Sequence, residues 1–182
     1  IAFFYVANGC ALFGADGGDA GAGFDFSGDK AVQATDYLVD LVANPNFANG
    51  DVGTQADAKA FFSGAWDYQK AVDAYGDNLG IVAPPSITIN GELKQMRSFA
   101  GSKAIGVNPA TALYKEHPEV AVALAAHLGG TDAQQAHYDL RNIIPTDTGV
   151  TVDDALAQAQ MDTMAFASII QPLQADMGNY WT

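Results

Sequence analysis

The sequence has little cysteine, little basic charge and no long apolar run. Its single cysteine, Cys10, excludes an intramolecular disulfide framework and a zinc site built on cysteines. Lysine and arginine number 8 against 21 aspartates and glutamates, which gives a formal net charge of -13 at pH 7. Because nucleic-acid-binding surfaces are basic and anionic lipid repels an acidic chain, we expect no nucleic-acid partner and no attraction to a membrane surface.

Charged residues make up only 16% of the 182 residues, whereas apolar residues make up 49%. An apolar fraction of this size can offset the entropy of ordering the chain, so intrinsic disorder is excluded. The length is enough for one domain with a sizeable core or for two small lobes.

Signatures of several enzyme classes are also missing. The sequence has no Gly-x-Ser-x-Gly nucleophile elbow and no P-loop. His117, His127 and His137 are ten residues apart, which would place them on different faces of a helix, so we expect no shared metal site. A glycosidase needs two facing carboxylates, and no pair is singled out among the 21 acids, which leaves that alternative open. We predict no metal, no cofactor and no catalytic residue.

The two ends of the chain are unusual. Residues 1–7 are apolar without a basic start, and Asn8-Gly9 interrupts them too early for a membrane span. The segment 7–10 is only faintly similar to a lipoprotein cleavage site, so we expect Cys10 to be a small buried residue. Since the chain starts inside an apolar run and stops at Tyr180-Trp181-Thr182, we expect a piece of a longer protein.

Apolar spacing predicts one clear helix and a helical second half. Residues 27–44 carry an apolar stripe at helical spacing that ends at Asn44-Pro45, and a further helix opens at Trp66 and runs to about Tyr75. Helices follow from Pro109 on, with Pro118 at a first helical position. The residues expected to face inward are Ala31, Ala34, Leu38, Leu41 and Val42 in the first helix, and Val120, Leu124 and Leu128 after Pro118.

Helix caps and short strands complete the prediction. Capping boxes are expected at Thr131 with Gln134 and at Thr151 with Asp154. Short strands are predicted over 24–26, 59–64, 79–83 and 98–107, and Asn90-Gly91 predicts a hairpin turn within 87–92. Together these elements indicate an α/β or α+β arrangement.

The chemistry that stands out is aromatic. Trp66 follows Ser63-Gly64-Ala65 and Trp181 follows Gly178-Asn179-Tyr180, so both tryptophans come directly after turn-forming residues. Aromatic faces at helix starts are suited to stacking on the C–H face of a sugar ring, and half-covering one such face is worth about 2 kcal/mol. The alternative is that both tryptophans are buried in the core.

Five motifs occur in a fixed order along the chain. They are Ala15-Asp16-Gly17-Gly18, the helix that ends at Leu41-Val42-Ala43-Asn44, the segments 63–67 and 76–85, the segment 98–109, and Gln171-Pro172 with Tyr180-Trp181. The middle segments carry a Gly-x-Trp turn before a helix, a Gly-Ile run ending in prolines, and a further extended stretch. This series resembles the bacterial maltose-binding protein family over nearly the whole chain.

The resemblance implies an α/β, type II periplasmic-binding-protein-like fold, with the start of the first lobe and the C-terminal end lying outside this chain. Residues 1–100 would belong to the second lobe, 104–145 would be helices of the first lobe, and 150–182 would return to the second lobe. The implied function is that of a non-enzymatic, extracytoplasmic receptor of a bacterial ABC importer, either periplasmic or a cell-surface lipoprotein. Such lobes close on a malto-oligosaccharide, and the permease subunits recognise the closed form.

The resemblance also implies ligand-binding residues. Trp66 and Trp181 match the stacking tryptophans of the family, and Gln171 matches a position that reaches the sugar, where the best-known member has Met. Tyr5 falls near the position of an aromatic sugar platform in the family. Its distance in sequence from Gly17-Gly18 differs from the family's spacing by one or two residues, so Phe4 is the alternative.

Two other functions stay open. One is a receptor of the same fold for another oligosaccharide. The other is a polysaccharide-processing enzyme or its accessory domain, which would need two carboxylates facing each other beside Trp66. We also expect the helices within 104–145 to expose an apolar patch through which copies of the chain would associate.

Overall fold

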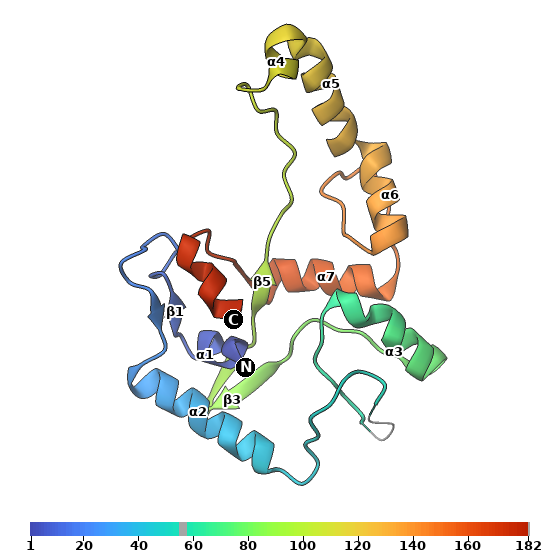
Figure 1. Ribbon diagram of the computed structural model, residues 1–182. Coiled ribbons are helices and arrows are strands. Elements are labelled where there is room, and N and C mark those ends of the chain that lie inside the picture. The colour runs from blue at the N-terminus through green and yellow to red at the C-terminus, as the bar shows by residue number, and fades with distance from the viewer. Residues whose placement is uncertain (55–57, 182) are drawn as a thin grey trace. The chain divides into compact units, whose positions relative to one another are not determined.

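The computed structural model describes residues 1–54 and 58–181, apart from the side chain of Trp181, and the chain forms two units (Figure 1). The first unit comprises Ile1–Gly101 and Asp162–Thr182, and the second comprises Ser102–Met161. Helix α7 (Ala155–Phe166) carries the chain from the second unit back to the first. Among the described residues, no helix combines the length and the apolar character needed to cross a membrane.

Helices of the first unit follow the predicted spacing. The helix expected over 27–44 is confirmed as α2, and the helix expected from Trp66 to about Tyr75 is confirmed as a 3-10 turn followed by α3. The described helical segments of this unit are α1 (Ala2–Ala7), α2 (Gly28–Ala43), α3 (Tyr68–Tyr75) and the 3-10 segments η1 (Ala65–Asp67), η2 (Gly76–Asn78) and η3 (Ala175–Trp181).

Helix α2 packs against α1 through its first half. Asn8, at the end of α1, donates its side-chain Nδ2 to the backbone oxygen of Lys30 at 2.8 Å. Ala31 and Ala34 are buried as predicted. Val42 is 60% exposed, contrary to the prediction, because the last turn of α2 lies beyond the stretch that α1 covers.

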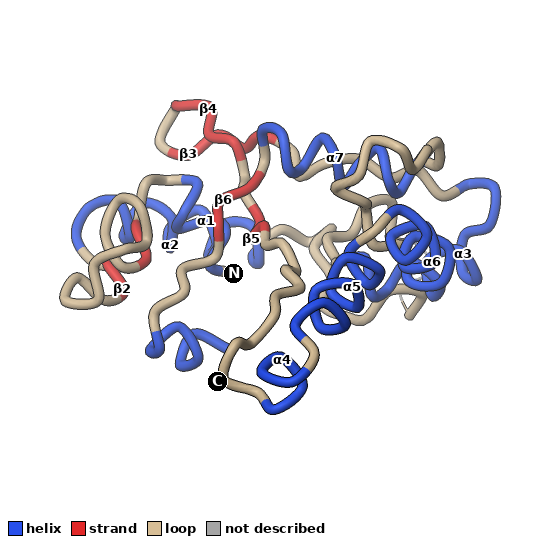
Figure 2. The backbone as a smooth tube through the Cα atoms, turned by 90° about the horizontal axis from the view of Figure 1, so that it is seen from above, coloured by secondary structure: helices blue, strands red, loops and turns tan. Residues whose placement is uncertain are grey.

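Short ladders pair the described strands of the first unit (Figure 2). The segment β1 (Ala11–Leu12) is antiparallel to β2 (Phe24–Asp25), and β3 (Ser86–Ile89) is antiparallel to β4 (Glu92–Gln95). Asn90 and Gly91 join β3 to β4 with φ of +50° and +78°, which confirms the predicted two-residue hairpin turn. A parallel pair, β5 (Ser98–Ala100) with β6 (Ser168–Ile170), brings two distant parts of the chain together.

Two of the predicted strands are wrong. Within the described chain, residues 59–64 and 79–83 are irregular, and Val82 is 83% exposed. A strand obtains its backbone hydrogen bonds from a neighbouring strand, and composition alone cannot show whether a neighbour exists. The extended segment predicted over 98–107 is a strand only in β5, because β6 offers just three residues to pair with it.

A small core holds the first unit together. Pro172 lies against Gly17, where an added Cβ would be 3.2 Å from the proline Cγ, and Gln174 donates its Nε2 to the backbone oxygen of Gly18 at 3.0 Å. These contacts fasten the C-terminal segment to the turn at Asp16. Cys10 is buried, as predicted. The central cluster consists of Leu12, Phe13 and Met177, flanked by Val6, Phe26, Phe99 and Tyr180.

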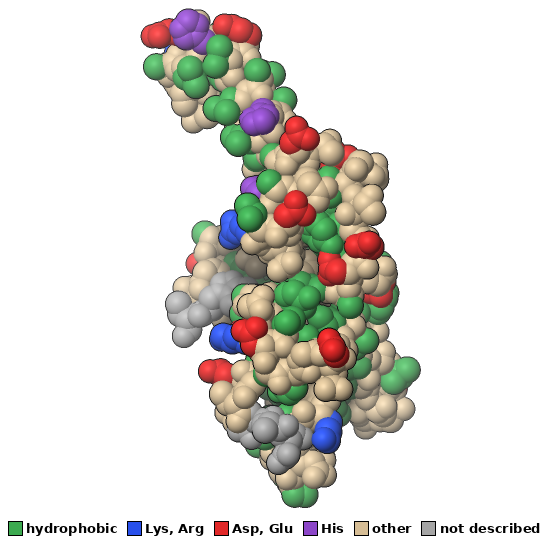
Figure 3. All heavy atoms as spheres, turned by 90° about the vertical axis from the view of Figure 1, so that its right-hand side faces the viewer, with side chains coloured by type: hydrophobic (Ala, Val, Ile, Leu, Met, Phe, Trp, Pro, Cys, Tyr) green, Lys and Arg blue, Asp and Glu red, His purple; other side chains and the backbone are tan. Residues whose placement is uncertain are grey.

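The second unit is helical. It contains α4 (Ala112–Glu116), α5 (Pro118–Gly129), α6 (Thr131–Arg141) and the first half of α7, and Pro118 occupies the first helical position as predicted. The predicted buried row on α5 is wrong, because apolar residues lie around most of this helix and only Ala121 is buried. Figure 3 shows exposed apolar side chains near its top, where α4 and α5 lie. The residues of the predicted row, Val120, Leu124 and Leu128, are 50%, 49% and 45% exposed.

Both predicted capping boxes are wrong. Helix α6 begins after Gly130, and the hydroxyl of Thr131 donates to the Asp147 side chain instead of capping the helix. Gln134 donates its Nε2 to the backbone oxygen of Gly129 at 2.8 Å and accepts from the backbone N–H of Asp147 at 3.0 Å, so this side chain joins the loop after α6 to the end of α5. At the start of α7, the carboxylate of Asp154 accepts from the Ala157 N–H, so this acid is the cap itself.

Candidate functional site

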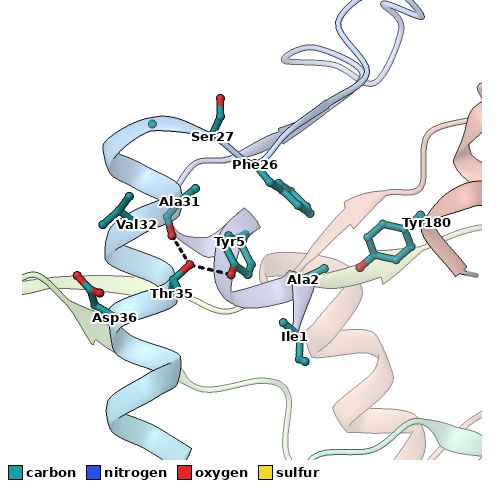
Figure 4. Close-up of a pocket in the computed structure, with 11 residues that line it drawn as sticks. Ile1, Ala2, Tyr5, Phe26, Ser27, Ala31, Val32, Thr35, Asp36 and Tyr180 are labelled. Carbon is teal, nitrogen blue, oxygen red and sulfur yellow. Dashed lines mark hydrogen bonds between the residues drawn. The ribbon is translucent and has the colours of Figure 1, made fainter.

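An open cavity of about 800 Å³ lies in the first unit, beside α1 and the first half of α2 (Figure 4). Its wall is mainly apolar and aromatic, with a few hydroxyl groups and one carboxylate. Figure 4 shows Val32 and Asp36 projecting from α2 on the side away from Tyr5, so Asp36 lies at the margin of the aromatic part. The lining residues are Ile1, Ala2, Tyr5, Phe26, Ser27, Gly28, Ala31, Val32, Thr35, Asp36 and Tyr180.

Tyr5 is the best-defined aromatic residue of this cavity. Its ring stacks on Phe26 with a centroid distance of 5.2 Å and an interplanar angle of 22°. Its hydroxyl lies 2.9 Å from Oγ1 of Thr35, whose own proton goes to the backbone oxygen of Ala31 at 2.8 Å. Because a threonine hydroxyl has one proton, Tyr5 must donate to Thr35. The phenol oxygen therefore keeps only its lone pairs for a ligand, and these would accept from a hydroxyl group.

Phe4, the alternative to Tyr5, faces a different part of the molecule. Its ring packs on Tyr37 of α2 at a centroid distance of 5.7 Å, and it is not part of the cavity wall. Successive residues of a helix point in different directions, so α1 can present only one of the two to the cavity. The structure places Tyr5 there.

Trp66 lies in η1 and is 84% exposed. The alternative that it is a core residue is therefore wrong. It is not part of the cavity wall. Phe62, four residues earlier, packs on Phe3 of α1 with a ring separation of 6.0 Å, so the segment that carries Trp66 is attached to the same helix as Tyr5.

The residue after Trp66 is the centre of a small polar network. Hydrogen bonds from Ser63, Lys70 and Trp66 lower the pKa of the Asp67 carboxyl, with the Ser63 hydroxyl as the largest contributor. Lys70 Nζ lies 3.0 Å from the Asp67 carboxylate and has its own pKa raised by this partner. The network fixes the turn in which the tryptophan stands.

The C-terminal residues predicted from motif order lie in the same unit. Gln171 is half-buried, and its backbone N–H donates to the Ala100 oxygen at 3.1 Å, continuing the pairing of β5 with β6, but it does not line the cavity. The backbone of Trp181 ends η3, and its side chain lies outside the described residues. Tyr180, its neighbour, does line the cavity, and burial raises the pKa of its phenol.

Of the residues that line the cavity, sequence reasoning had named only Tyr5 as a ligand-binding residue. Tyr180 stands next to a predicted site residue, and that adjacency was the available signal. Phe26 ends the short strand predicted over 24–26, and Thr35 is an ordinary polar residue of an amphipathic helix, so neither carried a pattern that points to a binding site. In the described ranges, no group of three or more histidine, cysteine, aspartate or glutamate side chains is placed to hold a metal ion.

Comparison with solved structures supports the resemblance drawn from the motifs. The chain is 42% identical to a protein whose structure was determined with acarbose, with a TM-score of 0.80, and the match covers 99% of this chain and 49% of that one. It is 22% identical to the maltodextrin binding protein MalE1 from L. casei BL23, determined without ligand, with a TM-score of 0.78 and coverage of 98% and 50%. The chain thus spans about half the length of the structures it matches.

These matches confirm the predicted α/β fold of the solute-binding proteins. No curated protein matches the sequence. The model of the bacterial extracellular solute-binding proteins matches residues 2–165, and the chain belongs to that family.

Proposed function

We propose that this chain contributes the sugar-stacking surface of a carbohydrate-binding protein that serves a bacterial ABC importer, with a malto-oligosaccharide as ligand. The observation that carries the proposal is Trp66, which is 84% exposed at the start of a helix, whereas the exposed phenylalanines of the described chain reach at most 55%. The protein determined with acarbose, 42% identical to this chain, supports a carbohydrate ligand.

The proposed mechanism is binding without bond making or breaking. The open face of Trp66 stacks on the C–H face of a sugar ring, and half-covering it contributes about 2 kcal/mol. Tyr5 accepts a hydrogen bond from a sugar hydroxyl, since its own proton is held by Thr35. Trp181 and Gln171 supply further contacts, as the family resemblance implies.

We further propose that residues 1–100 and 150–182 belong to the second lobe of the whole receptor and that 104–145 are helices of its first lobe. Closure of the two lobes on the sugar would convert binding into a shape that the permease subunits recognise. The site of action would be extracytoplasmic, in the periplasm or on a lipid-anchored receptor at the cell surface. Exposed apolar residues of α5 would allow copies of this chain to associate, which sedimentation at increasing protein concentration measures.

Calorimetric titration of the chain with maltotriose tests the ligand. We expect weak binding, because the chain spans half the length of the solved receptors. Trp66→Ala should abolish the signal and Trp66→Phe should retain part of it, while Leu93→Ala, at a 74% exposed apolar position on β4, should leave it unchanged. Equal binding by Trp66→Ala and the unchanged chain would contradict the proposal.

A thermal-shift panel of sugars separates malto-oligosaccharides from other oligosaccharides, because a ligand raises the unfolding temperature according to its concentration relative to its dissociation constant. Hydrolysis of a chromogenic glucoside by the chain would favour the polysaccharide-processing enzyme instead.

A further inference from the structure

In the Trp66 turn, the indole lies against Gly64. A Cβ added to Gly64 would lie 2.3 Å from Cη2 and Cζ3 of Trp66 and 2.6 Å from Cε3. These three consecutive atoms are nearly equidistant from that point, so the point lies over the face of the six-membered ring and not beyond its edge. The glycine backbone therefore lies against one face of the six-membered ring, while the tryptophan as a whole stays 84% exposed.

Space, and not backbone conformation, requires glycine at this position. Gly64 has φ of -106° and ψ of 172°, an extended conformation that any residue can adopt. A carbon at 2.3 Å from an aromatic ring is far inside van der Waals contact, so a side chain here would displace the indole. A substitution to alanine thus moves the ring while leaving the backbone conformation allowed.

Polar contacts fix the turn that carries the indole. Hydrogen bonding from the Trp66 side chain makes only the smallest contribution to lowering the pKa of the Asp67 carboxyl. That carboxylate is itself fixed by the Ser63 hydroxyl and by Lys70 at 3.0 Å. The backbone N–H of Asp67 also donates to the Gly64 oxygen at 3.0 Å, which closes the turn.

We propose that Gly64 and Asp67 are positioning residues that clamp Trp66 as a rigid, one-sided stacking platform. Gly64 backs one face of the six-membered ring, Asp67 fixes the turn that carries the ring through Ser63, Lys70 and the Gly64 oxygen, and the remaining face is left to the ligand. The clamp restricts rotation of an 84% exposed side chain before any ligand arrives. A ligand that stacks on a ring already held in place does not have to order it, which raises affinity without an added contact.

The consequence for the ligand rests on the proposed function, whereas the clamp itself does not. Ordering one rotamer-rich side chain weakens binding by about three- to tenfold. Gly64→Ala should therefore weaken maltotriose binding by about that factor, with a smaller loss for Asp67→Asn. Because only one face of Trp66 is open, the platform also predicts that a single sugar ring stacks on this tryptophan.

The clamp can be measured without any sugar. The chain has two tryptophans, so Trp181→Phe leaves Trp66 as the sole indole. In that background, Gly64→Ala should change the acrylamide quenching constant of Trp66 fluorescence and lower its anisotropy, with an intermediate effect for Asp67→Asn. The matched control is Gly80→Ala, at an exposed glycine whose added Cβ would meet nothing within 4 Å, and it should change neither value.

A second measurement does not depend on the Trp181→Phe variant being folded. The chain with both tryptophans intact, labelled with 5-fluorotryptophan, gives fluorine resonances that Trp66→Phe assigns. Gly64→Ala should then shift and narrow the Trp66 resonance, since a released ring moves faster.

The outcomes separate the two proposals. A Gly64→Ala variant that quenches like Gly80→Ala overturns the clamp, whatever the sugar titration shows. A clear quenching difference without any maltotriose binding by the unsubstituted chain supports the clamp and counts against the proposed function. Weaker maltotriose binding by Gly64→Ala, with unchanged binding by Gly80→Ala, supports both.

Discussion

Asp154 joins two helices of the second unit, and its removal should destabilise that unit by about 2–3 kcal/mol. One carboxylate oxygen accepts from the Ala157 N–H at 2.8 Å, and the other accepts from the Tyr138 hydroxyl on α6. Loss of a helix N-cap costs about 1 kcal/mol, and loss of a hydrogen bond to a charged group costs about 1.5–3 kcal/mol before solvent exposure reduces it. Asp154→Ala removes both, whereas Asp154→Asn keeps a cap and should cost about 1 kcal/mol.

A double-mutant cycle in urea isolates the link between the helices. Tyr138→Phe removes only the hydroxyl, so we expect a cost of about 1 kcal/mol for it alone. With Asp154 already replaced by alanine, the same substitution should cost almost nothing, which corresponds to a coupling energy of about 1 kcal/mol. Costs that add within 0.3–0.5 kcal/mol, the limit for independent sites, would refute the link.

The pH dependence of the same pair gives an independent check. Burial raises the pKa of the Asp154 carboxyl, but the hydrogen bonds from Tyr138 and from backbone N–H groups outweigh it, so the pKa in the folded state is lowered. Stability from this group is therefore present above the unfolded-state pKa of about 3.9 and is lost as the pH falls through the folded-state value. The hydrogen bond to Asp154 raises the pKa of Tyr138, so that contribution is present below about pH 10 and is lost as the pH rises through the raised value.

Three further predictions concern the first unit. Gly17→Ala should destabilise it by about 1–2 kcal/mol in urea unfolding, because Gly17 has φ of +77° and its added Cβ would press on Pro172 at 3.2 Å; an unchanged midpoint would contradict this. Asn8→Ala should lower the free energy of unfolding by about 1–2 kcal/mol, since Asn8 is 7% exposed and donates to two acceptors on α2. Faster hydrogen exchange of the α1 amides would show the accompanying loss of order in that helix. The Ser63 hydroxyl is the largest contributor to the lowered pKa of Asp67, so the contacts of this carboxylate in the Trp66 turn are complete above about pH 4 and are lost as the pH falls through the lowered folded-state value; a Trp66 quenching constant that stays unchanged through that range would argue against a role for Asp67 in the turn.

Local features of the chain were predictable because their causes are local. The apolar spacing and the Asn44-Pro45 stop define α2 without reference to the rest of the fold. The Asn90-Gly91 turn needs φ above zero at both residues, and the structure has it. Pro118 begins α5 for the same kind of reason, since a first helical position does not use its missing N–H.

Pairings between distant segments were not predictable from one sequence. The β5 strand finds its partner in β6, which lies beyond the whole second unit, and the strand-like residues 59–64 find none in the described chain. The candidate site divides in the same way. Trp66 was identified from a local motif, whereas the contact of Tyr5 with Thr35, thirty residues away, depends on how α1 packs on α2.

Two of the aromatic groups in the proposed site, Trp66 and Tyr5, are connected to one short helix. Helix α1 has six residues, and an isolated helix of that length is not stable in water, so its order comes from tertiary contacts. Phe3 of this helix packs on Phe62, which precedes the Trp66 turn, and Tyr5 is held by Thr35 on α2. The Trp66 clamp orients its own ring through local contacts. The contact of Phe62 with Phe3 connects the Trp66 turn to α1, and Tyr5 is itself a residue of α1. If the proposed site is correct, ligand affinity in this chain should therefore follow the packing of α1, even though this helix supplies only Tyr5 to that site.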